Sequence, residues 1–210
     1  MLAFATAAIA QTEAQRATFR VTLSAKVTKT WDYVAEREEA GCTSRTRVRG
    51  SRTVTLRSVR PTVVVVTSSS GRLRFSPALV RSVTALTRQG GSVSTSGCGN
   101  PTQRGCARTQ RSFTNQSFAF FRSRPGELIF RPTRDYTIAS TCPPEDRAVR
   151  TERPGIHLAE GRLVERDLFN LRVRSLTANG GYDEETTIEG GPDGRVLARA
   201  DWHLTFMRVY

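Results

Sequence analysis

The sequence is poor in lysine, histidine and cysteine, and it has no long hydrophobic run. Lys26 and Lys29 are the only lysines among 32 basic residues, and the two histidines, His157 and His203, stand far apart. No apolar stretch approaches the roughly 20 residues that a membrane-spanning helix requires, so we expect no such helix. None of the four cysteines lies in a C-x-x-C pair or beside a histidine at a zinc-like spacing. We therefore predict neither a metal site nor a cofactor.

Motifs of known catalytic sites are lacking as well. There is no G-x-S-x-G sequence, and serines are too numerous for one of them to stand out as a nucleophile. His203 follows Asp201 by two residues, but a triad is recognised by its geometry and not by its spacing in the chain. We expect a non-catalytic protein, with an exported hydrolase of unrecognised site as an alternative.

Acidic residues near the C-terminus raise the question of a calcium site, because carboxylate oxygens are the ligands that calcium takes. They do not follow the spacing of an EF-hand or of a nonapeptide repeat. Ion pairs with Arg195 or Arg199 on a facing strand would satisfy the same carboxylates, and we favour that interpretation. The acidic residues are Asp183, Glu184, Glu185, Glu189 and Asp193.

The first ten residues, MLAFATAAIA, resemble a truncated export signal. They contain a short apolar segment and an Ala8-Ile9-Ala10 triplet that suits a signal peptidase, but they lack a basic start. An even number of cysteines agrees with an oxidising compartment. We expect an extracytoplasmic protein, secreted or held in the cell envelope, with residues 11–210 forming a single β domain.

Two long stretches of alternating apolar and polar residues, at the two ends of the chain, predict strands. Residues 19–34 and 194–206 each place apolar side chains on one parity, and each carries one of the two tryptophans, Trp31 and Trp202, on that parity. Both exceed the usual strand of about five or six residues, so we expect them to bend and to contribute to two sheets or to a barrel corner. We predict that they pair and that both tryptophans fill the core.

Similar short patterns recur between these ends, separated by turn signals at intervals typical of an antiparallel sandwich or barrel. The sequence thus predicts an all-β protein, an antiparallel β-sandwich or barrel-like sandwich of roughly nine or ten strands with little helix. GGPDG, at 190–194, is the strongest hairpin signal. Residues 35–50 and 90–110, which hold three of the cysteines, are expected to be long loops.

The four cysteines are candidates for two disulfides. Three pairings are possible, and the sequence alone does not select one. The Gly, Asn and Pro residues between Cys98 and Cys106 suit a tight turn, so we favour a Cys98–Cys106 bond, which leaves Cys42 with Cys142. A structural role is favoured over a redox role because nothing near these cysteines indicates an activated thiolate.

Positive charge is concentrated in the middle of the chain. No Asp or Glu occurs between Glu39 and Glu127, whereas that stretch contains fifteen arginines. The rest of the chain has 17 basic and 19 acidic residues, so the whole excess of +13 lies in this segment. Clustered guanidinium groups attract polyanions and can bind phosphate, sulfate and carboxylate groups in a bidentate manner.

We therefore interpret residues 40–126 as a candidate surface for an anionic polymer, such as a wall polymer, a glycan or a nucleic acid. The alternatives are a solvated sheet face in an arginine-rich proteome and a structural or protein-interaction module without such a ligand. Phe113, Phe118, Phe120 and Phe121 are expected to pack in a strand core and not to stack on bases. The residues proposed for binding are Arg45, Arg47, Arg49, Arg52, Arg104, Arg108 and Arg111.

Overall fold

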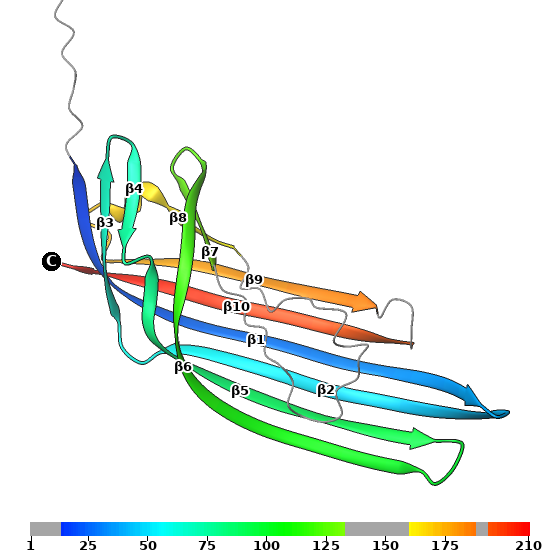
Figure 1. Cartoon of the computed structure of the whole chain (residues 1–210). Helices are drawn as coiled ribbons and strands as arrows, with labels where there is room; N and C mark the ends of the chain where they lie inside the picture. Colours follow the sequence, from blue (N-terminus) through cyan, green and yellow to red (C-terminus); the bar gives the residue numbers. More distant parts are fainter. Residues whose placement is uncertain (1–13, 133–159, 188–192) are drawn as a thin grey trace, which may run out of the picture.

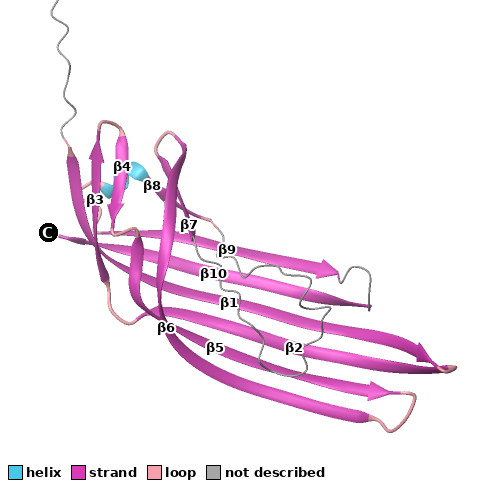
Figure 2. Ribbon diagram, viewed as in Figure 1, coloured by secondary structure: helices cyan, strands magenta, loops and turns pink. Residues whose placement is uncertain are grey.

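The protein is almost entirely antiparallel β-sheet. Its computed structural model describes residues 14–132, 160–187 and 193–210 (Figure 1). Within these ranges there is no α-helix, and a single short 3-10 helix, η1, spans Glu165–Leu168 (Figure 2). The strands are β1 (Gln15–Glu39), β2 (Cys42–Ser58), β3 (Thr62–Ser69), β4 (Arg72–Ser76), β5 (Leu79–Ser96), β6 (Thr102–Arg124), β7 (Glu127–Pro132), β8 (Gly161–Val164), β9 (Ser175–Thr187) and β10 (Asp193–Val209).

The sheet closes partly into a ring. Its strand order is β10-β9-β8-β7-β6-β5-β2-β1-β3-β4, and β10 also pairs with β1. Eight strands thus follow one another around the ring, while the β3–β4 hairpin branches off from β1. Closure is weakest between β8 and β9, which are joined by one residue pair, Arg162 with Asn179. The predicted all-β fold with barrel-like character is confirmed.

The length of β1 is explained by its three partners. One edge pairs with β10 from Thr18 to Val34, which confirms that the two terminal strands are neighbours. The other edge pairs first with β3, over Gln15–Val21, and then with β2, over Ser24–Glu39. A single strand therefore serves both the hairpin branch and the ring. The long strands β9, β10, β1, β2, β5 and β6 extend beyond the short ones (Figure 1).

The main hydrophobic core lies at the end of the molecule where the short strands are. Its largest buried side chains are Trp202, Phe19 and Phe206, whose neighbours come from β3, β4, β7 and η1. Phe19 and Phe206 meet edge to face, with ring centroids 5.9 Å apart. Edge-to-face aromatic pairs of this kind add to the stabilisation that comes from burial alone. Trp202 fills the core as predicted.

A second, smaller cluster lies farther along the long strands. It consists of Tyr33, Val48 and Val196, with Trp31 and Val93 packed against it. Trp31 is only half-buried and belongs to this cluster, so its predicted place in the main core was wrong. The strand is so long that its apolar face passes beyond the main core before it reaches Trp31.

The two segments expected to be loops are mostly strand. Residues 35–39 end β1, and β2 begins at Cys42; likewise β5 continues to Ser96 and β6 begins at Thr102. These segments contain few apolar residues, so they lack the apolar–polar alternation that predicts a strand. Ser, Thr and Arg can alternate along a strand when both of its faces meet solvent. The predicted hairpin at 190–194 lies mostly outside the described residues.

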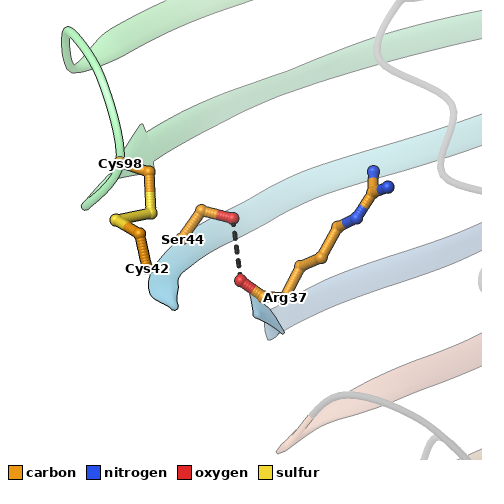
Figure 3. Close-up of a disulfide and its surroundings, with 4 residues drawn as sticks. All are labelled: Arg37, Cys42, Ser44 and Cys98. Carbon is orange, nitrogen blue, oxygen red and sulfur yellow. Dashed lines mark hydrogen bonds between the residues drawn. A yellow bond between two sulfur atoms is a disulfide. The ribbon is translucent and has the colours of Figure 1, made fainter. Parts of the chain in front are cut away.

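A disulfide joins the tip of the β1–β2 hairpin to the tip of the β5–β6 hairpin. Cys42 begins β2, Cys98 follows β5, and their Cα atoms are 5.8 Å apart (Figure 3). In the same turn the hydroxyl of Ser44 donates a hydrogen bond to the carbonyl of Arg37 over 3.2 Å. The favoured pairings, Cys98–Cys106 and Cys42–Cys142, were therefore both wrong. The pairing of β2 with β5 brings Cys42 close to Cys98 although they are far apart in sequence.

Cys106 also takes part in a disulfide. Its proposed role as a bonded cysteine is thus confirmed, although its bond is not with Cys98. Cys142, the fourth candidate, lies outside the described residues, as do His157 and the proposed signal segment at residues 1–10.

Candidate anion-binding face

The parity of each strand divides the arginines between two faces of the long sheet. Side chains that share the parity of the core point to the inner face, and those of the other parity point to the outer face. Cross-strand pairs carry this assignment from strand to strand. Arg47 and Arg49 of β2 lie opposite Val34 and Asp32 on the polar parity of β1, so they belong to the outer face.

Three of the arginines proposed for binding are compensated by carboxylates on this outer face. Arg47 donates two hydrogen bonds to Asp32, and Arg49 donates one, over 2.9 to 3.1 Å. Arg45 lies 3.5 Å from a carboxylate oxygen of Glu36. The hydrogen bond from Arg47, aided by the charges of Arg47 and Arg49, lowers the pKa of Asp32. These arginines therefore contribute little uncompensated charge.

Arg52, Arg104 and Arg108 lie on the inner face. Cross-strand pairs join Lys29 to Arg52, Arg52 to Gln89 and Gln89 to Arg108, so these four side chains form one row across β1, β2, β5 and β6. Lys29, Arg52 and Gln89 are already engaged in interactions within the chain. A shallow hollow of about 250 Å³ lies beside the row at β5 and β6, lined by Thr87, Gln89, Arg108, Thr109 and Gln110.

Exposed basic side chains without an ion pair in the described chain lie on the outer face of β2, β5 and β6, beside Lys26 of β1. Arg57, Arg88 and Arg111 are all exposed, and none forms an ion pair with a carboxylate in the described parts of the chain. We call these three residues the arginine patch. Of the seven arginines proposed from the sequence, only Arg111 belongs to it.

Cross-strand register fixes the arrangement of the patch. Arg57 faces Thr84 of β5, and Arg88 faces Thr53 of β2 on one side and Thr109 of β6 on the other. Arg111 faces Leu86, which places it one row away from Arg88. Diagonal neighbours of this kind lie about 7 to 8 Å apart. Arg57 lies farther from Arg88, because its partner Thr84 is four residues from Arg88 along β5. The three arginines are therefore spread over adjacent strands, with threonines and Leu86 between them.

An exposed aromatic ring borders the patch. Phe113 of β6 is 73% exposed, and it lies two residues from Arg111 on the same face. Phe121, also on β6, is 39% exposed, but the guanidinium of Arg131 lies 5.3 Å from the centre of its ring. The prediction that these two residues pack in a core was wrong. It holds for Phe118, which is buried, and Phe120 packs against the core.

The opposite edge of the outer face carries charges of both signs. Arg195 lies 3.8 Å from Glu185, and Arg199 lies 4.0 Å from Asp183. These are the ion pairs expected from the sequence in place of calcium ligands. The described residues contain no group of His, Cys, Asp and Glu side chains arranged to hold a metal ion.

His203 lies on this same outer face and contacts an amide. Its Nδ1 is 2.7 Å from the side-chain oxygen of Asn179 on β9, while the neighbouring Asp201 pairs with Arg199. His203 and Asp201 thus share a strand face, but each contacts a different partner.

Within the described ranges, no helix is long and apolar enough to span a bilayer.

The residues missed by sequence analysis are Arg57 and Arg88. Both belong to the basic segment, but neither stands in a run as dense as Arg45 to Arg52. They could have been found by asking which arginines lie on the same sheet face as the carboxylates of β1 but not opposite them. Asp32 and Glu36 lie on the outer parity of β1 and thus face only the tip of β2.

Comparisons with known proteins give little guidance. No family model matches the chain, and no curated protein matches it. Two solved structures are similar over 90% of this chain and 99% of theirs: Ail, the attachment invasion locus protein of Yersinia pestis, at 10% identity and a TM-score of 0.15, and Ail in complex with the heparin analogue sucrose octasulfate, at 9% identity and a TM-score of 0.14. Scores this low establish neither a shared fold nor a shared function.

Proposed function

We propose that the protein is a non-catalytic, extracytoplasmic module that binds an anionic polymer on the outer face of β2, β5 and β6. The observation that carries the proposal is the arginine patch, Arg57, Arg88 and Arg111, which is exposed and lacks carboxylate partners in the described chain. Because the three cations lie on one face of three adjacent strands, their potentials add over that face.

The same face explains why total charge is a poor guide to the site. The densest arginine run, at the tip of β2, lies opposite Asp32 and Glu36. A polyanion that approached this tip would have to compete with two carboxylates or meet their repulsion. The patch offers charge without that competition, so it is the better anchoring point.

The proposed compartment agrees with the cysteines. The disulfide between Cys42 and Cys98 joins two hairpin tips that lie on adjacent strands. Structural disulfides persist in oxidising compartments and are rare in the cytosol of mesophiles. An extracytoplasmic ligand would then be a polymer of the cell surface or of the surroundings.

Binding of the oxidised protein to heparin and to single-stranded DNA, measured across a salt series, tests this function. Changing Arg57, Arg88 and Arg111 together to Gln should weaken binding and flatten its salt dependence, because fewer counterions are released. For single-stranded DNA the slope falls by about 0.7 for each phosphate that the protein no longer neutralises.

A second triple variant supplies the matched control. Changing Arg45, Arg47 and Arg49 together to Gln removes the same number of charges from the same face, at positions that carboxylates already compensate. We expect this variant to bind more tightly than the patch variant. Equal losses in both variants would indicate an effect of net charge alone and would reject the patch as a site.

A further inference from the structure

Phe113 is an exposed aromatic ring whose neighbours on the outer face include Thr84, Arg111 and Leu86. Its cross-strand partner on β5 is Thr84, whose own partner on β2 is Arg57. Arg111 lies two residues away on the same strand face, about 7 Å along β6. The ring is therefore flanked by two cations of the arginine patch.

The contrast with Phe121 shows that the chain covers one exposed ring of β6 and leaves the other open. Arg131 lies over the face of Phe121, at a distance typical of a cation–π contact. The described chain places no cation and no second ring against Phe113. The residue is 73% exposed, so most of its ring surface is accessible.

We propose that Phe113 is a stacking platform for a base and that the polymer bound by the arginine patch is a single-stranded nucleic acid. This inference rests on the proposed function and adds the identity of the polymer. Proteins that bind single strands without sequence preference combine a positive surface for the phosphates with aromatic side chains on which bases stack. A sheet face that presents both groups on neighbouring strands meets those two requirements.

The ring favours a nucleic acid over a sulfated glycan or a lipid surface. A sulfated chain is held chiefly by cations, and its puckered sugar rings, which carry charged groups, contact a phenyl ring over less of its face than a planar base does. Insertion into a bilayer would favour a belt of several apolar side chains, whereas Thr53, Thr84 and Thr109 surround the patch. Every base, in contrast, has a π-face that can stack on Phe113.

The test compares oligothymidylate with an abasic oligodeoxynucleotide of the same length, and with heparin, at one salt concentration. Phe113→Leu should weaken binding of oligothymidylate about 5- to 150-fold, the range for the loss of one base stack. Its affinity for the abasic strand and for heparin should not change, because the cations remain. Phe113→Trp, which keeps an aromatic ring at this position, should retain the preference for oligothymidylate.

Phe121→Leu is the matched control, since it removes an exposed ring of the same strand that Arg131 already covers. We expect it to leave all three affinities unchanged. If Phe113→Leu changes none of the affinities, or changes all of them equally, the stacking role is wrong while polyanion binding stands. If the wild-type protein binds none of the three polymers, the proposed function itself fails. Thermal unfolding of each variant confirms that the fold is retained.

Discussion

The carboxylate of Asp32 accepts a bidentate pair of hydrogen bonds from Arg47 on the neighbouring strand. Nε of Arg47 donates to Oδ1 over 3.0 Å, and Nη2 donates to Oδ2 over 2.9 Å. Arg49 adds a third hydrogen bond to the same group. One carboxylate thus engages two guanidinium groups and limits the charge that the tip of β2 presents to a ligand.

Replacing Asp32 with Asn should therefore strengthen polyanion binding. The variant frees Arg47 and Arg49 on the same face as the patch without changing the size of the side chain. If both arginines then contact phosphates, the salt dependence of single-stranded DNA binding should steepen by up to about 1.4 in slope. Titration of labelled DNA across a salt series measures this effect, and an unchanged slope would show that the tip of β2 lies outside the binding surface.

The same carboxylate predicts how binding depends on pH. The pKa of Asp32 is lowered in the folded protein, first by the hydrogen bond from Arg47, so Asp32 stays charged to a pH below the ordinary value of about 3.9. Its stabilising contribution is present above the unfolded pKa and is lost as the pH falls through the folded pKa. The advantage of Asp32→Asn in heparin binding should hold at neutral pH and disappear in that acidic range. An advantage that persists after protonation would mean that Asp32 does not act through its charge.

The disulfide between the hairpin tips should stabilise the fold substantially. Its cysteines are separated by 56 residues, and closing a ring of that size in the unfolded chain corresponds to about 4 kcal/mol on the chain-entropy model. Changing Cys42 and Cys98 together to Ser should lower the free energy of unfolding by about 2 to 4 kcal/mol. Urea denaturation monitored by tryptophan fluorescence measures it, with Ser44→Ala at the same tip as the control. A loss no larger than in the control would indicate that strand pairing alone fixes the tips.

The sequence was sufficient to predict the fold where one strand face is apolar. Alternation in β1 and β10 predicted their existence, their pairing and the burial of Trp202, because a one-residue shift would expose the whole apolar set. The same reasoning failed at Trp31, where the strand has already passed the main core. Pattern alone does not reveal how far along a long strand the core extends.

The site was predicted less well, for two physical reasons. The tips of β1, β2, β5 and β6 are polar on both faces, so their alternation carries no hydrophobic signal and they were expected to be loops. Whether a carboxylate neutralises an arginine depends on the residue opposite it on the next strand. The pairing register of these polar strand ends cannot be derived from the sequence. Arg45, Arg47 and Arg49 were therefore favoured over Arg57 and Arg88.

The narrow contact between Gly161 and Trp202 provides a last test of the packing. Gly161 is buried at the start of β8, the strand whose single residue pair with β9 closes the ring. A Cβ atom added there would lie 2.6 Å from the indole of Trp202 and 2.8 Å from the backbone oxygen of Asn179. Gly161→Ala should therefore lower the free energy of unfolding by about 1 to 3 kcal/mol, because neither the core tryptophan nor the backbone of β9 can move freely.

Gly105→Ala is the appropriate comparison. Its added Cβ would meet nothing closer than 3.8 Å, so replacing a strand glycine there should be neutral or slightly stabilising. Thermal and urea unfolding of the two variants measure the difference. If Gly161→Ala proves as stable as Gly105→Ala, then β8 is not held against Trp202, and the ring does not depend on close packing at its weakest seam.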